Sequence, residues 1–161
     1  MVRSPLSVEA PSVEATCDVA EALGARLAPG DTVLLEGPVG AGKSHFARCL
    51  IGSLLEAPED IPSPTFTLVQ SYAGRAGEIW HADLYRLSDS SELVELGLEE
   101  AFETAICLVE WPDRLGDLAP PGALSIRFEP GPEETARRLT LSWTDPRWAA
   151  RLEGLAEPAH G

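Results

Sequence analysis

The sequence predicts an α/β fold built on a mixed, mostly parallel sheet with helices on both faces. Two segments, TVLLEG (32–37) and AICLVEW (105–111), are short and apolar throughout, which is typical of strands covered on both sides. Segments with helical spacing of their apolar residues alternate with strand-like segments, the pattern of a sheet flanked by helices. A length of 161 residues fits a single domain, which we place over residues 13–156, between a flexible segment (1–12) and a tail (157–161).

The expected elements follow from apolar spacing and from the residues that stop each one. A first helix is predicted from Thr16, as its N-cap, to Leu27, because a Pro-Gly pair follows shortly after. Two strand-like segments, 65–72 and 78–87, are separated only by AGRAG, which predicts an antiparallel hairpin. The other expected elements are a helix from Lys43 to about Leu55, a short acidic helix capped between Ser88 and Ser91 and ending at Phe102, strands over 123–130 and 137–143, and a C-terminal helix around 146–156.

The charge balance is strongly acidic, with 26 Asp and Glu against 12 Lys and Arg and a formal net charge of −14. Because proteins bind nucleic acid largely by neutralising its phosphates with basic side chains, direct binding by this chain alone is disfavoured. No apolar run approaches the roughly 20 residues that span a bilayer, so no membrane association is expected. The N-terminus lacks the apolar stretch of a secretion signal, and we expect a cytoplasmic protein.

The three cysteines, Cys17, Cys49 and Cys107, are odd in number, far apart in the sequence and form no CxxC pair. This usage favours buried thiols over a disulfide framework or a zinc site. The three histidines do not cluster with the cysteines, so no dedicated transition-metal site is expected.

Residues 37–44, GPVGAGKS, match the phosphate-binding pattern G-x-x-x-x-G-K-[ST] between an expected strand and an expected helix. At this composition, roughly 0.001 chance matches to the pattern are expected. Glycines let the backbone curl so that N–H groups point at phosphate oxygens, and the helix adds the positive end of its dipole. Lys43, the only lysine in the chain, would reach the β- and γ-phosphates, and the Ser44 hydroxyl would bind Mg²⁺. The alternative is a glycine-rich turn with an exposed lysine; we favour an ATP–Mg²⁺ site in a P-loop NTPase-like domain.

A magnesium ligand is expected at the end of a neighbouring buried strand, where Glu110 stands, since ligands bind at the carboxyl ends of strands in open α/β sheets. Glu110 could instead be a solvated strand-end carboxylate. Alternation along the second hairpin strand places on one face Ile79, His81, Asp83 and Tyr85. Asp83 is a candidate for holding the water shell of the metal or orienting the attacking water. His81 is expected to be a hydrogen-bonded structural side chain.

Two further positions have two interpretations each. Thr65, in SPTF (63–66), either senses the γ-phosphate and Mg²⁺, as the hydroxyls of nucleotide switches do, or belongs to a proline-led turn capped by Ser63. Trp111, beside Glu110, could stack on the base or fill the core.

The chain resembles the bacterial TsaE-type ATPase family, which serves threonylcarbamoyladenosine modification of tRNA. The resemblance covers roughly residues 13–143 and rests on four ordered segments: GPVGAGKS (37–44), SPTFTLVQSY (63–72), HADLYRL (81–87) and ICLVEWPDRL (106–115). Ser44 stands where threonine is common in the family.

The resemblance implies roles for individual residues. It implies ATP binding by Val39, Gly40, Ala41, Gly42, Lys43 and Ser44, Mg²⁺ binding by Ser44 and Glu110, roles near the γ-phosphate for Thr65 and Asp83, and a place close to the nucleotide for Trp111. It also implies that ATP hydrolysis is coupled to a partner complex of the TsaD/TsaB type, which makes the modified adenosine next to the anticodon, so that tRNA is handled only indirectly.

The expected reaction is in-line attack of water on the γ-phosphate, in which Lys43, Mg²⁺ and the loop amides spread the developing charge. None of the eleven arginines can be assigned as an arginine finger, so hydrolysis by the isolated chain is expected to be slow and to be stimulated by partners. Two other functions would use the same loop. One is a small-molecule kinase, which usually adds an arginine-rich lid and an acceptor pocket that are not apparent here; the other is a module in which ATP gates assembly without hydrolysis.

Overall fold

The computed structural model describes residues 3–38, 41–57, 61, 68–85, 87, 89, 91–131 and 135–155. Over these ranges the chain forms one seven-stranded sheet in the order β1-β7-β6-β2-β5-β4-β3. The strands are β1 (Leu6–Ala10), β2 (Thr32–Glu36), β3 (Val69–Gly74), β4 (Gly77–Asp83), β5 (Ile106–Glu110), β6 (Leu124–Pro130) and β7 (Arg137–Ser142). The helices are α1 (Val13–Gly24), α2 (Lys43–Leu54), α3 (Ser91–Leu96), α4 (Leu98–Thr104) and α5 (Arg147–Arg151), with 3₁₀ turns over η1 (Pro112–Leu118).

The sheet is mixed, as predicted. The four central strands, β6, β2, β5 and β4, are parallel to one another. β7 and β3 run antiparallel to their neighbours, and β1 runs antiparallel to β7, so five of the seven described strands share one direction. β3 and β4 meet at Gly74 and Gly77, which confirms the antiparallel hairpin over the described part of that segment.

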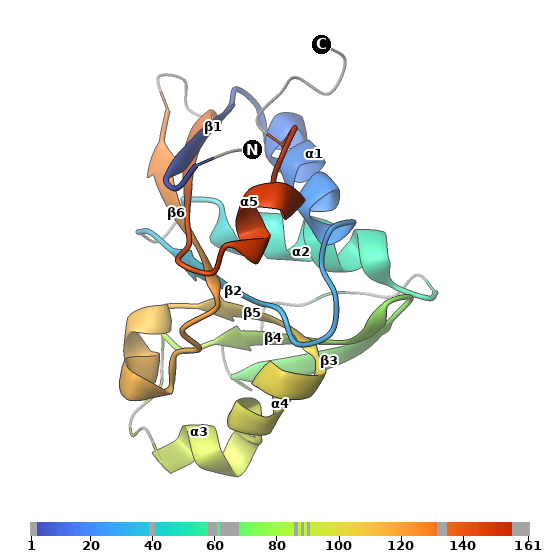
Figure 1. Cartoon of the computed structure of the whole chain (residues 1–161), viewed down its shortest axis with the longest axis vertical. Helices are drawn as coiled ribbons and strands as arrows, with labels where there is room; N and C mark the ends of the chain where they lie inside the picture. Colours follow the sequence, from blue (N-terminus) through green and yellow to red (C-terminus); the bar gives the residue numbers. More distant parts are fainter. Residues whose placement is uncertain are drawn as a thin grey trace.

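Helices cover both faces of the sheet, which confirms the predicted fold class (Figure 1). On one face α1, α2 and α5 lie over a core that includes Phe46 and Trp148, both fully buried. On the other face α3 and α4 lie over a second core that includes Leu98. Strand β2 contributes to both, because Val33 belongs to the first core and Leu34 to the second. Strands β2 and β5, whose residues belong alternately to the two cores, are therefore covered on both sides, as their apolar sequences predict.

The prediction of a flexible segment over residues 1–12 is wrong for Leu6–Ala10, which form the edge strand β1 along β7. Val8 and Ala10 are buried in the first core, and the residues between and before them are exposed or half-buried. This period-two pattern covers only five residues and is flanked by Pro and Ser, so the composition of the segment obscures it.

The first helix begins earlier than predicted. Ser12, rather than Thr16, is the N-cap of α1, because the Ser12 hydroxyl accepts a hydrogen bond from the Ala15 N–H at 3.0 Å. Thr16 lies inside the helix and is buried, and α1 ends at Gly24. Both residue types can cap a helix, and the hydrogen bond to the Ser12 hydroxyl identifies Ser12 as the cap.

The acidic helix predicted to end at Phe102 is two helices, α3 and α4. They are separated at Gly97, which adopts a left-handed φ of 77°. The C-terminal helix α5 is also shorter than expected and spans Arg147–Arg151. Within the described ranges, no helix is long and apolar enough to cross a membrane.

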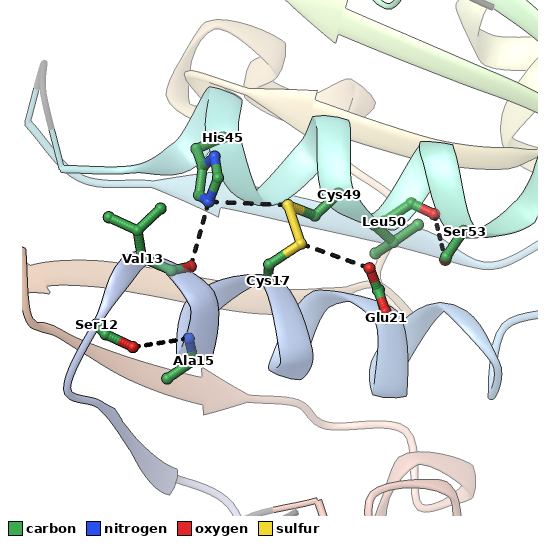
Figure 2. The surroundings of a disulfide bond; sticks show 9 residues. All are labelled: Ser12, Val13, Ala15, Cys17, Glu21, His45, Cys49, Leu50 and Ser53. Atoms are coloured by element: carbon green, nitrogen blue, oxygen red, sulfur yellow. Dashed lines mark hydrogen bonds between the residues drawn. A yellow bond between two sulfur atoms is a disulfide. The ribbon is translucent and has the colours of Figure 1, made fainter. Parts of the chain in front are cut away.

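The prediction that all three cysteines are free thiols is wrong for two of them. Cys17 in α1 and Cys49 in α2 are joined by a disulfide, with their Cα atoms 5.4 Å apart, whereas the sequence favours free thiols (Figure 2). The two positions are 32 residues apart and meet only because α1 packs beside α2, which no local pattern reveals. Cys107 in β5 is a buried free thiol, as predicted, and burial raises the pKa of this thiol to about 12.

Candidate functional site

The glycine-rich loop, residues 37–44, connects β2 to α2 at the carboxyl ends of the central parallel strands. Gly37 adopts a φ of 143°, and a Cβ atom there would lie 2.6 Å from the carbonyl oxygen of Phe128, so a side chain would clash with the backbone of β6. Gly42 is the N-cap of α2, with a φ of 99°, and has no side chain that could cap the first N–H groups of the helix. These N–H groups and the helix dipole favour an anion at this position.

Lys43, the first residue of α2, folds its side chain back over the loop. Its Nζ donates a hydrogen bond to the Gly37 carbonyl oxygen at 2.6 Å and lies 3.5 Å from the centre of the Trp111 ring. Lys43 is only 5% exposed, and this burial lowers the pKa of its ammonium group, while the carboxylates of Glu110 and Asp83 act in the opposite direction. A cation that donates to a carbonyl oxygen of the glycine-rich loop is suited to binding phosphate oxygens there.

Glu110, the last residue of β5, links α2 to the hairpin. Its Oε1 accepts a hydrogen bond from the Ser44 hydroxyl at 3.0 Å, and its Oε2 lies 2.7 Å from Nε2 of His81 in β4. Because an ionised carboxylate only accepts hydrogen bonds, His81 Nε2 is the donor. His81 is fully buried and Glu110 nearly so. The imidazole therefore fixes the orientation of a carboxylate whose other oxygen faces Ser44, and His81 is hydrogen-bonded, as predicted.

Asp83 ends β4 directly beside Glu110 in the parallel pairing of β4 with β5. It is buried, and its Oδ1 accepts a hydrogen bond from the Tyr85 N–H at 3.1 Å. The Tyr85 ring packs on Trp111, with ring centroids 4.9 Å apart. Trp111 adopts a left-handed φ of 61°, which is uncommon for a bulky residue, and this turn after β5 directs its ring toward Lys43. Trp111 therefore contacts the site as well as the second core.

Most of the site residues predicted from the sequence lie close together in the structure. The described ones that lie together are Ala41, Gly42, Lys43, Ser44, Asp83, Glu110 and Trp111. The other three, Val39, Gly40 and Thr65, lie outside the described residues. Among the residues that the structure describes, no three His, Cys, Asp or Glu side chains are grouped so as to hold a metal ion by themselves.

Arg137 is a contact of the loop that sequence reasoning missed. It begins β7, and its Nε donates a hydrogen bond to the Ala41 carbonyl oxygen at 2.9 Å, while its Nη1 donates to the Ala136 carbonyl oxygen at 2.8 Å. Arg137 stands 96 residues after Ala41 and is one of eleven arginines, so no local signal marks it. Only the sheet order brings the start of β7 beside the loop.

Comparison with known proteins shows which family has a similar sequence. Residues 10–139 match the family model of the threonylcarbamoyl adenosine biosynthesis protein TsaE. The chain is 40% identical over 118 residues to the tRNA threonylcarbamoyladenosine biosynthesis protein TsaE of Rickettsia conorii, which covers 73% of this chain and 67% of that protein. It is 35% identical over 142 residues to TsaE of Mycobacterium tuberculosis, covering 83% of this chain and 84% of that protein.

A solved structure agrees with these sequence matches. The crystal structure of YdiB from Bacillus subtilis is similar to this chain with a TM-score of 0.77 and 28% identity, covering 96% of this chain and 95% of that one. The range matched by the family model contains the glycine-rich loop, Asp83, Glu110 and Arg137. The resemblance found in the sequence is thus confirmed, and the chain belongs to the TsaE family of threonylcarbamoyl adenosine biosynthesis proteins.

Proposed function

We propose that this chain is a Mg²⁺-dependent P-loop ATPase of the cytoplasm. It serves threonylcarbamoyladenosine modification of tRNA, at the adenosine next to the anticodon, through a partner complex of the TsaD/TsaB type. The observation that carries the proposal is the hydrogen bond of 3.0 Å between Ser44 and Glu110, next to the buried ammonium of Lys43. A phosphate-binding loop alone suggests a nucleotide, whereas a hydroxyl paired with a buried carboxylate adds the ligands that a hydrolase needs for its metal.

The loop and the start of α2 fit the phosphates of ATP. The left-handed Gly37 and Gly42 curve the backbone, and the amides from Val39 to Ser44 would face the phosphate oxygens. Lys43 Nζ donates a hydrogen bond to the Gly37 carbonyl oxygen of the same loop. Binding of ATP would exchange this neutral acceptor for charged phosphate oxygens, which form stronger hydrogen bonds with an ammonium group.

The oxygens near the loop also fit Mg²⁺. This ion prefers hard oxygen ligands, keeps several waters and commonly uses one or two carboxylates together with substrate phosphates. Ser44 and Glu110 would hold the ion, and Asp83, beside Glu110 in the sheet, would accept hydrogen bonds from its water shell. When bound, Mg²⁺ would neutralise charge on the β- and γ-phosphates.

In the hydrolytic step, the residues of the chain position groups and stabilise charge. Lys43 would donate to the phosphate oxygens on which charge develops. Asp83 would orient the attacking water, and Thr65 would contact the γ-phosphate as a switch hydroxyl. His81 would keep Glu110 in the orientation that faces Ser44. Trp111 would lie close to the nucleotide, where Lys43 and Tyr85 already contact its ring.

The acidic surface supports an indirect role with respect to tRNA. With a formal net charge of −14, the chain has few basic groups to neutralise phosphates, so tRNA would be held by the partner complex. Hydrolysis by the isolated chain is expected to be slow and to increase when the partner complex is added.

The proposal is tested by depleting the protein in its native host and analysing the nucleosides of tRNA. Threonylcarbamoyladenosine should fall and should return when the wild-type chain is supplied again. In parallel, a pull-down with and without ATP should recover the transfer complex. A normal level of the modified nucleoside after depletion would overturn the proposal, and phosphoryl transfer to a metabolite rather than to water would favour the kinase alternative.

The contact of Arg137 with the loop leads to a prediction on ATP affinity. Arg137→Gln removes the hydrogen bond from Nε to the Ala41 carbonyl oxygen. We expect ATP binding to weaken roughly 3- to 10-fold, because the loop is less well organised before it binds phosphate. Titration with a fluorescent ATP analogue measures the change.

Arg138→Gln is the matched control, because the neighbouring Arg138 is exposed and pairs instead with Glu9 at 2.8 Å. This variant should bind the analogue like the wild type. Equal affinities for all three proteins would show that Arg137 does not support the loop.

A further inference from the structure

The disulfide between Cys17 and Cys49 takes no part in the proposed chemistry, although Cys49 lies in α2, the helix that carries Lys43 and Ser44. The two residues face each other from adjacent helices, α1 and α2 (Figure 2), and both are half-buried rather than enclosed in the core. A disulfide that can be approached from solvent can exchange with small thiols, whereas a fully buried one is protected until the protein unfolds.

Each sulfur has a polar neighbour one turn away on its own helix. Glu21 Oε2 lies 3.5 Å from the Sγ of Cys17, and His45 Nε2 lies 3.8 Å from the Sγ of Cys49 (Figure 2). A thiol is a weak hydrogen-bond donor. If the disulfide is reduced, the Cys17 thiol therefore has an acceptor in place in the Glu21 carboxylate. His45 Nε2, in contrast, faces the Val13 carbonyl oxygen and so carries the proton, and it can only donate toward the Cys49 sulfur, a weak acceptor. The site accommodates the reduced pair as well as the oxidised one, which is what a reversible pair requires.

The position of the bond couples it to the glycine-rich loop. The chain segment that it closes, from Cys17 to Cys49, contains β2 and the entire loop. Cys49 stands in the same helix as Lys43 and Ser44, only five residues after Ser44. A second contact supports the same link, because His45 Nε2 lies 3.3 Å from the Val13 carbonyl oxygen at the start of α1. The disulfide thus fixes α1 against the middle of α2, and the His45 contact fixes the turn that carries Lys43 and Ser44.

We propose that Cys17 and Cys49 form a reversible thiol–disulfide modification site, whose oxidation holds α1 against α2 and keeps the start of α2 in the orientation that binds phosphate. The exchange and its effect on stability do not depend on the function proposed above. The effect on ATP affinity does rest on that proposed function.

The exchange partner is a low-molecular-weight disulfide such as glutathione disulfide. One cysteine thiolate attacks a sulfur of this disulfide and expels the first glutathione thiolate, which leaves a mixed disulfide. The second cysteine thiolate attacks the protein sulfur of the mixed disulfide and expels the second glutathione thiolate. The two protons lost by the cysteines end on two glutathione thiols, so the cysteine pair is oxidised by two electrons and glutathione disulfide is reduced by two.

The third cysteine, Cys107, is an internal control for the reaction with small disulfides. Cys107 is fully buried in β5, and burial raises the pKa of its thiol to about 12, so very little thiolate is present near neutral pH. Oxidation by small disulfides should therefore be confined to Cys17 and Cys49, and Cys107 should react only after unfolding.

The experiment equilibrates the full chain with defined ratios of oxidised to reduced glutathione and counts free thiols by alkylation and mass spectrometry. Two thiols should be lost together as the ratio rises and should return when it falls. The oxidised protein should melt roughly 5–10 °C above the reduced protein, because the bond constrains the unfolded chain. It should also bind an ATP analogue about 3- to 10-fold more tightly, because the start of α2 is held in place.

Cys17→Ser and Cys49→Ser should behave like the reduced wild type at every glutathione ratio, and Cys107→Ala should retain both shifts. A cysteine pair that stays reduced at all ratios, or that reduced glutathione opens only in denaturant, would overturn the proposal of reversible exchange. Equal ATP affinity of the oxidised and reduced proteins would overturn the coupling to the loop. If neither form binds nucleotide while the pair still exchanges and shifts the melting temperature, the modification site stands and the proposed ATPase function fails.

Discussion

Lys43→Ala is expected to weaken ATP binding by roughly 100-fold or more, equivalent to about 3 kcal/mol. The residue is 5% exposed, and the hydrogen bond from its ammonium group to the Gly37 carbonyl oxygen shows that the side chain reaches the start of the loop. The lost interaction is between a buried cation and a charged phosphate, where the low local dielectric strengthens the attraction. Isothermal titration with ATP and a non-hydrolysable analogue measures the affinity directly.

The matched control for this substitution is Arg48→Ala, because Arg48 is an exposed cation on the same helix and its removal changes the net charge equally. Arg48→Ala should bind ATP within about 2-fold of the wild type, since surface charges are screened by salt. Circular dichroism and melting curves separate loss of binding from loss of fold. If Lys43→Ala binds ATP as tightly as Arg48→Ala does, the loop is not the phosphate site.

The pH dependence of wild-type binding provides a second readout of the same group. Burial lowers the pKa of Lys43, so its ammonium group loses its proton at a lower pH than an exposed lysine would. Since only the charged form attracts phosphate, ATP affinity should begin to fall at moderately alkaline pH in the wild type. In Lys43→Ala the residual affinity should not show this decline.

The parts of the structure that could be predicted from the sequence are those that local residues determine. The apolar segments of β2 and β5 can be stable only as strands covered on both sides, and both are buried as expected. Because parallel strands present their carboxyl ends at one edge, the order of strand, loop and helix was enough to place Glu110 near Ser44. Alternation in β4 likewise placed His81 and Asp83 on the same side.

The parts that could not be predicted depend on contacts between distant segments. Arg137 reaches the loop only because β7 lies next to β6, and Cys17 meets Cys49 only because α1 packs along α2. Neither contact leaves a periodic or motif signal in its own neighbourhood. The contact of Trp111 with Lys43 is of the same kind, because it depends on the left-handed turn after β5. Local patterns therefore predict the glycine-rich loop and the strand ends that lie beside it, and tertiary packing determines which other side chains contact them.

Glu110→Gln is expected to separate ATP binding from ATP hydrolysis. Glutamine keeps the size of the side chain and one carbonyl oxygen, so the contact with Ser44 can persist, but the negative charge that would hold Mg²⁺ is lost. In the absence of magnesium, ATP affinity should stay within about 3-fold of the wild type, because phosphate binding uses Lys43 and the loop amides. With Mg²⁺ and the partner complex present, single-turnover hydrolysis should fall roughly 100-fold.

Glu36→Gln provides the matched control, because Glu36 ends β2 at the same edge of the sheet and its side chain is 43% exposed, beside Arg127. The same chemical change at this position should leave both binding and hydrolysis close to the wild type. Nucleoside analysis of tRNA then decides how ATP is used. Loss of threonylcarbamoyladenosine together with hydrolysis in Glu110→Gln means that turnover is required. If the modification persists at its normal level while hydrolysis is lost, nucleotide binding alone is sufficient, and the chain acts as an ATP-gated assembly module rather than as an ATPase.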